Sequence, residues 1–80
     1  MGFYVQAEYH TSRGRIDLVV KTPDYCYVME FKFDGTAEEA LEQIKDRNYT
    51  LPFQLDGQQI IRIGMNFDSQ TRNIERFVTG

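Results

Sequence analysis

The sequence has one cysteine, Cys26, so it can form no internal disulfide and no zinc site built from several cysteines. Cys26 lies in an apolar run, where a free cysteine is expected to pack in the core as a small hydrophobic side chain. A single free cysteine suits a reducing compartment, and we expect a cytoplasmic protein. His10 is the only histidine, and neither Ser12 nor Cys26 has the surrounding motif of a nucleophile. A nucleophile–histidine active site is therefore disfavoured.

Positive charge is also scarce. The chain has 9 Lys+Arg and 12 Asp+Glu, a formal net charge of -3, and so lacks the basic excess of most independent nucleic-acid-binding domains. Charge alone disfavours DNA as a partner, unless several carboxylates hold a divalent cation that reverses the local potential. No stretch approaches the roughly 20 apolar residues of a membrane span, so no membrane partner is expected. Glycine-rich phosphate loops and zinc-binding spacings are absent as well.

What the chain does have is the composition of one small folded domain. Its 80 residues are 41% hydrophobic and 14% aromatic, close to globular averages. Length limits the interpretation to a single domain, residues 1–80, with a thin core. We interpret it as a piece of a longer protein, because one predicted strand is apolar on both faces and the chain offers cover for only one.

Alternation of apolar and polar residues predicts five strands. They cover Phe3–His10, Arg15–Lys21, Tyr25–Phe33, Gln59–Phe67 and Asn73–Thr79. In the second strand the pattern places Ile16, Leu18 and Val20 on one face, with Asp17 and Val19 on the other. Thr36 and Glu39 have the spacing of a capping box, which predicts the start of a helix. The apolar stripe of this helix consists of Ala37, Ala40, Leu41 and Ile44. The helix is expected to end between Asn48 and Pro52.

The order β-β-β-α-β-β indicates an α/β (α+β) fold with a mixed central sheet of about five strands. The third strand is apolar on both faces except near its end, yet one helix can cover only one face. We therefore infer a missing covering element, most simply a helix that precedes Phe3 in a longer protein. Alone, the chain is expected to form a homodimer that buries some of Tyr25, Tyr27, Met29 and Phe31.

Three charged residues are the candidates for chemistry. Glu30 and Lys32 share one face of the third strand, and a hairpin through Thr22–Asp24 places Asp17 opposite roughly residue 30. Two neighbouring carboxylates beside an ammonium suit a hydrolytic site that holds Mg²⁺. The alternative is structural, because Asp17 and Lys32 also suit a cross-strand ion pair with Glu30 reaching solvent.

Three segments resemble the PD-(D/E)XK nuclease superfamily: Gly-Arg-Ile-Asp at 14–17, Glu-Phe-Lys at 30–32, and a helix with Ala-Leu-x-Gln-Ile at 40–44. Within it, the chain is most similar to the nuclease-like C-terminal domain of bacterial proteins with an AAA-ATPase-like N-terminal region. The resemblance implies a restriction-endonuclease-like core that lacks its first helix. It also implies Asp17 and Glu30 as ligands of Mg²⁺ (or Mn²⁺), and Lys32 as the catalytic lysine. Gln43 matches a glutamine beside the family's site, although it also suits a solvated helix position.

The expected function is metal-dependent hydrolysis of DNA phosphodiester bonds. The alternative is a non-catalytic interaction or regulatory module of the same fold, attached to an ATPase. Many active members add an acidic residue from the helix before the first strand, and Glu8 is the only carboxylate upstream of Asp17. Arg15 can contact phosphate, or it is simply solvated beside the turn.

Overall fold

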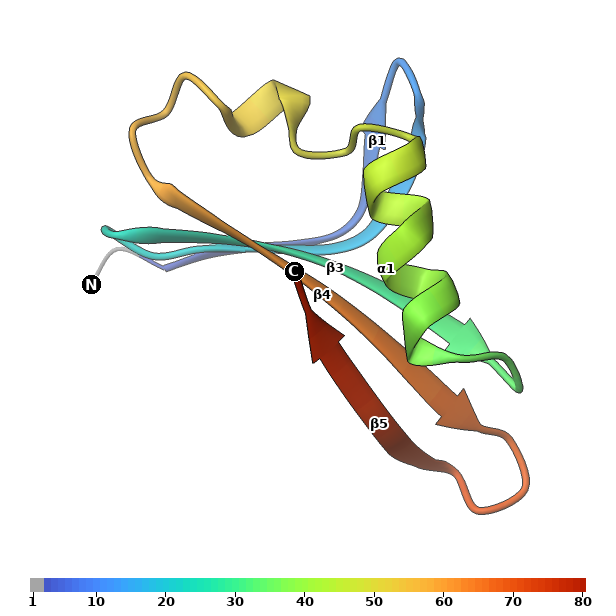
Figure 1. The fold of residues 1–80 in the computed structure, drawn as a ribbon. Coiled ribbons are helices and arrows are strands. Elements are labelled where there is room, and N and C mark those ends of the chain that lie inside the picture. The colour runs from blue at the N-terminus through green and yellow to red at the C-terminus, as the bar shows by residue number, and fades with distance from the viewer. Residues whose placement is uncertain (1–2) are drawn as a thin grey trace.

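The computed structural model describes residues 3–80 as five strands, one α-helix and a short 3₁₀ helix (Figure 1). The elements are β1 (Tyr4–Thr11), β2 (Gly14–Lys21), β3 (Tyr25–Phe33), α1 (Ala37–Asp46), η1 (Leu51–Phe53), β4 (Gln59–Asp68) and β5 (Asn73–Thr79). The predicted strands and helix are therefore confirmed in type and order. No helix of residues 3–80 has the length and apolar character needed to cross a membrane.

The five strands form one mixed sheet in which spatial order follows chain order, β1-β2-β3-β4-β5. β1–β2, β2–β3 and β4–β5 pair antiparallel, whereas β3–β4 pair parallel. Parallel neighbours need a crossover connection, and α1 with η1 supplies it. The predicted α+β class is thus the observed one.

The start of α1 is fixed by the predicted capping box. Thr36 Oγ1 accepts a hydrogen bond from the Glu39 N–H at 3.0 Å, and Glu39 Oε1 accepts one from the Thr36 N–H at 2.9 Å. Both bonds satisfy backbone donors that a helix start leaves unpaired. Ala37, Ala40 and Ile44 are buried along one stripe. The helix therefore begins at a defined residue with a defined face toward the sheet.

Gly64 of β4 lets α1 lie close against the sheet. A Cβ atom built at this glycine would be 2.4 Å from the carbonyl oxygen of Ala37 and 2.5 Å from the backbone nitrogen of Leu41. Both contacts are with backbone, which cannot swing aside as a side chain can. A side chain at position 64 would push the helix outward, so the absence of one sets the height of α1 above β3 and β4.

The core lies between the sheet and the layer formed by α1 and η1 (Figure 1). Cys26 is fully buried in it, as predicted. Tyr49 is 2% exposed and packs with Phe53 in the same cluster, so it is a core residue. One predicted position was wrong: Ile16 is buried in the core with Val19 and does not share the face of Leu18 and Val20, which are half-buried. Val19 pairs with the buried Val28, which fixes its direction.

The opposite face of the sheet carries no covering element among residues 3–80 (Figure 1). We call this the open face. It consists of the odd-numbered residues of β3 and of the residues that pair with them across the sheet. Tyr25 and Phe33, at its two ends, are exposed, in agreement with the bare face that the sequence pattern indicates.

Candidate active site

The candidate site lies where β2 and β3 separate. Their backbone pairing runs from Lys21↔Cys26 to Leu18↔Met29 and ends there. The N-terminal part of β2, before Leu18, is not paired with β3. It curves away from β3 together with β1, toward the C-terminal end of α1 (Figure 1). In that register the next pair is Asp17 with Glu30. The β2–β3 hairpin thus places these two residues opposite each other, as we predicted from its short loop.

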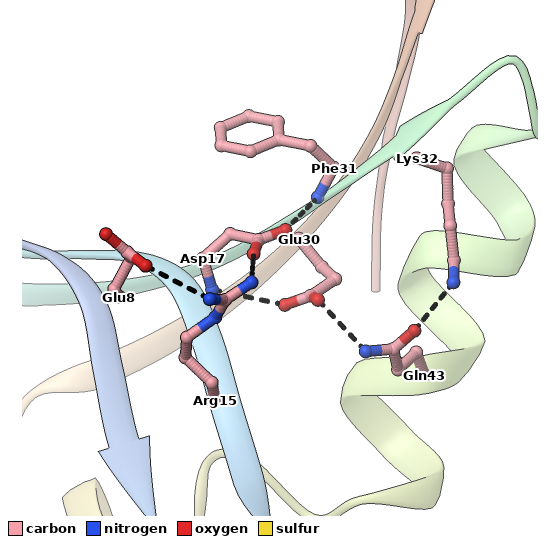
Figure 2. Close-up of polar contacts among 7 residues, drawn as sticks. All are labelled: Glu8, Arg15, Asp17, Glu30, Phe31, Lys32 and Gln43. Carbon is pink, nitrogen blue, oxygen red and sulfur yellow. Dashed lines mark hydrogen bonds and ion pairs between the residues drawn. The ribbon is translucent and has the colours of Figure 1, made fainter.

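Side-chain carboxylates replace the missing ladder bonds at this split (Figure 2). The Asp17 N–H donates to Glu30 Oε2 at 3.3 Å, and the Phe31 N–H donates to Asp17 Oδ2 at 2.9 Å. Each strand thus holds the carboxylate of the other through a backbone donor. Two acidic groups are fixed side by side, although their negative charges repel.

Glu30 is the more buried of the two, with 5% of its surface exposed. Its pKa is raised from 4.5 to about 7, first by burial and second by the charge of Asp17, while the Asp17 N–H and the Lys32 ammonium oppose the shift. A carboxyl in this position keeps its proton into the neutral range unless positive charge arrives. The pair is therefore poised to take up a cation as it loses that proton.

Gln43 of α1 connects Glu30 with Lys32 (Figure 2). Its Nε2 donates to Glu30 Oε1 at 3.0 Å, and its Oε1 accepts from Lys32 Nζ at 2.7 Å. The amide is thus half-buried between an acid and a base, and not a solvated helix residue. Lys32 also lines a hollow of about 350 Å³ on the surface of α1. Lys32 is thereby held beside the carboxylates and still reachable from solvent.

Arg15 lies on the other side of Asp17. Its guanidinium forms an ion pair with Glu8 at 3.0 Å and lies 4.0 Å from Asp17 Oδ1. Glu8 itself has a φ of 53°, a left-handed conformation that is uncommon for a residue with a side chain. Glu8 therefore contacts the site through Arg15 and joins neither Asp17 nor Glu30 in a common cluster.

The donor set is compatible with a hard divalent cation. Asp17 and Glu30 supply carboxylate oxygens, and Mg²⁺ in proteins often takes one or two carboxylates and completes its shell with water and substrate phosphate. Within residues 3–80 no three acidic, histidine or cysteine side chains gather as a metal-binding group. The pair is thus a partial ligand set, which fits Mg²⁺ better than a metal that needs a full protein cage.

Comparison with known proteins assigns the class. A model of the PD-(D/E)XK nuclease superfamily matches residues 1–77, so the chain belongs to this superfamily. Its members generally use divalent metals such as Mg²⁺. The chain is also 35% identical over 80 residues to the protein described as "Uncharacterized protein in vnfD 5'region" of Azotobacter chroococcum mcd 1. The match covers 98% of this chain and 16% of that protein. No solved structure matches the chain.

The structure brings together all four residues that the sequence singled out, Asp17, Glu30, Lys32 and Gln43. Two contributions to this arrangement were missed. Gly64 sets the position of α1, and its only signal in the sequence is a glycine inside a strand pattern. The ion pair of Arg15 with Glu8 was missed because it depends on how far the β1–β2 hairpin curves.

Proposed function

We propose that this domain hydrolyses phosphodiester bonds of DNA with the help of Mg²⁺ or Mn²⁺. The observation that carries the proposal is the carboxylate pair at the β2–β3 split, linked through Gln43 to an accessible lysine. A structural ion pair needs neither a buried second carboxylate nor a bridging amide. Membership of the nuclease superfamily supports the same conclusion.

In this proposal Asp17 and Glu30 hold the cation. When bound, it supplies positive charge that offsets the two carboxylates and the phosphoryl oxygens of the substrate. Glu30 must be ionised to act as a ligand, and its raised pKa makes that state dependent on pH. The backbone donors that hold both carboxylates keep them in place whether or not the cation is present.

Lys32 orients the attacking water and stabilises the negative charge that develops at phosphorus. Gln43 is a positioning residue, because it acts on the reaction only through Lys32 and Glu30. Arg15 is half exposed beside Asp17, and its planar fork of donors suits two oxygens of a backbone phosphate. We assign it to binding of the DNA strand and not to the chemical step.

The second candidate is a non-catalytic module of the same fold that serves an ATPase-like region of a longer protein. Two observations favour it: the net charge of -3, which opposes DNA, and the coverage of only 16% of the longer relative. In this case the carboxylate pair is structural. We also propose, under either candidate function, an N-terminal ATPase-like region in the longer protein and a cytoplasmic location.

A cleavage assay separates the two candidates. Single-stranded and double-stranded DNA are incubated with the chain in Mg²⁺, in Mn²⁺ and in chelator, and the products are followed by gel electrophoresis. Catalysis predicts cleavage that depends on the cation and is lost in Asp17→Asn and Lys32→Ala. Glu42→Gln, on the exposed side of α1, is the matched control and should cleave normally. Cleavage that is equal in Lys32→Ala and in the unmodified chain would contradict the proposal, because the lysine would then play no part in the reaction.

A further inference from the structure

The tip of the β1–β2 hairpin lies against the end of α1 and has no backbone ladder with β3. In the part of the chain that the structure describes, Gly14, Arg15 and Ile16 pair with β1, and the pairing with β3 begins at Leu18. We call residues 8–17 of this hairpin the arm. Figure 1 shows the arm curving toward the C-terminal end of α1. Asp17 is the last residue of the arm, so its distance from β3 depends on where the arm lies.

Gly14 fits against α1 because it has no side chain. A Cβ atom built there would be 2.8 Å from Tyr49 Oη and 3.4 Å from Arg47 Nη1. Its φ of 138° also lies in the region that favours glycine. Next to it, Arg47 Nη1 donates to the carbonyl oxygen of Arg13 at 3.3 Å. We call this contact of Arg13 and Gly14 with Arg47 and Tyr49 the seam.

The helix side of the seam is held in place by the end of α1. Arg47 is the C-cap of α1, and its backbone N–H donates to the carbonyl oxygen of Gln43 at 3.0 Å. The Tyr49 N–H donates to the carbonyl oxygen of Ile44 at 3.1 Å, and the Tyr49 side chain is buried in the core. The arm therefore meets a fixed surface at its tip, while the fully buried Ile16 anchors its middle.

One face of α1 contacts both halves of the candidate site. Gln43 forms hydrogen bonds with Glu30 and Lys32 of β3. Arg47 follows Gln43 by four residues, so the two side chains are neighbours on the helix surface, and both line the hollow beside Lys32. Asp17 belongs to the arm, which Arg47 contacts. The helix thus supports the two carboxylates from both sides of the β2–β3 split.

We propose that Gly14 and Arg47 are positioning residues, which hold the arm on α1 and thereby keep Asp17 against Glu30. Segments with few supporting contacts open locally more often than the rest of a fold. Without the seam the arm can move away from β3, and the hydrogen bonds that the Asp17 N–H and the Phe31 N–H donate then break more often. The inference concerns the geometry of the site, and its bearing on catalysis rests on the proposed function.

Amide hydrogen exchange followed by NMR tests the seam on the 80-residue chain, without DNA and without a cation. Arg47→Ala should speed exchange of the Asp17 and Phe31 amides about three- to tenfold, as expected for the loss of one hydrogen bond. Exchange at the buried Val28 should keep its rate, because the opening is local. Arg47→Lys should recover part of the protection, since its ammonium can still donate to the arm. Lys45→Ala removes the same charge from an exposed position of α1 and is the control.

A pair of variants tests Gly14 separately. Gly14→Ala adds a Cβ that meets Tyr49 Oη, and the double variant with Tyr49→Phe removes the atom that this Cβ would meet. The backbone strain at residue 14 is the same in both. The double variant should therefore regain part of the protection that Gly14→Ala loses at Asp17 and Phe31, with Tyr49→Phe alone as the reference.

Titration with Mn²⁺ adds a readout at the carboxylates. Loss of a positive charge alone should strengthen cation binding slightly, as in Lys45→Ala, whereas loss of positioning should weaken it in Arg47→Ala. A chain that binds no cation would contradict the proposed hydrolysis, and the exchange rates would still decide the inference about the seam.

Three results would overturn the inference. Asp17 and Phe31 amides that exchange at the original rate in Arg47→Ala would show that the seam does not hold the arm. An equal acceleration at Val28 would make the seam a contribution to overall stability alone. Cation binding at least as strong in Arg47→Ala as in Lys45→Ala would leave the arginine with an effect of charge only.

Discussion

Asp17 and Glu30 lie opposite each other just past the last backbone pair of β2 and β3. The Asp17 N–H donates to Glu30 Oε2, and Asp17 Oδ2 accepts from the N–H of Phe31. The site is therefore built into the sheet at the point where its ladder ends. Backbone donors keep the two carboxylates close and buried, at a cost that appears as the raised pKa of Glu30, caused first by burial and second by the charge of Asp17. The first predictions follow from that cost.

In metal-free buffer, the free energy of unfolding should fall as the pH rises from about 5 to about 7. Folded Glu30 keeps its proton up to a pKa of about 7, whereas unfolded Glu30 ionises near 4.5, so the folded state binds more protons in this window. The loss is about 3 kcal/mol at most, from 1.36 kcal/mol per pKa unit. Urea unfolding at several pH values measures it.

Glu30→Gln should make this pH profile flatter than that of the unmodified chain. The glutamine can still accept from the Asp17 N–H, and the Gln43 amide can turn to accept from it. Glu42→Gln, at an exposed site, should keep the original slope. Equal slopes for Glu30→Gln and the unmodified chain would show that Glu30 ionises normally in the fold.

Gln43→Ala should lower the free energy of unfolding by about 1–2 kcal/mol, because Glu30 Oε1 loses its donor in a buried place. If the domain cleaves DNA, kcat should fall while KM changes little, since Gln43 positions Lys32 and touches no substrate.

Gln43→Glu separates the amide's role from simple filling of space. It should raise the pH at which Glu30 ionises, through a third negative charge. A change in KM alone, with kcat unchanged in Gln43→Ala, would contradict the positioning role.

Arg15→Ala should weaken DNA binding without weakening cation binding. The guanidinium faces Asp17 and Glu8 from the exposed side, so its loss removes a phosphate contact and leaves both carboxylate ligands in place. Fluorescence anisotropy with labelled DNA in Ca²⁺ measures the first effect, and Arg15→Lys should recover only part of the affinity because lysine lacks the bidentate fork. Unchanged affinity in Arg15→Ala would make the residue a solvated surface charge.

Gly64→Ala should destabilise the fold by about 2 kcal/mol through overpacking against the backbone of α1. The displaced helix should also carry Gln43 away from Glu30, so the pH dependence of stability should change in the same variant. Gly57→Ala is the comparison, because a Cβ there meets nothing within 4 Å and only its φ of 77° is strained. Thermal unfolding of both variants gives the difference, and an equal shift would mean that α1 can move outward freely.

The sequence predicts much of this arrangement because its determinants are local. Short loops and period-two patterns fix the strands, and the hairpin at Thr22–Tyr25 fixes the register that brings Asp17 to Glu30. The bridge formed by Gln43 could not be predicted from spacing. It depends on the height and rotation of α1, which Gly64 sets through contact with a strand far along the chain. Likewise, the burial of Ile16 together with Val19 depends on the path of β2 outside its pairing with β3, which periodicity within β2 alone does not show.

Calorimetric titration of the chain with Mg²⁺ and Mn²⁺ is the most direct test of whether Asp17 and Glu30 form a metal site, because it needs neither DNA nor any further domain. We expect weak binding, since two carboxylates give an incomplete shell, with affinity lost in Asp17→Asn and in Glu30→Gln and kept in Glu42→Gln. Heat of binding that is the same in Glu30→Gln as in the unmodified chain, or no binding at any concentration of either cation, would contradict the claim that Asp17 and Glu30 form a metal site.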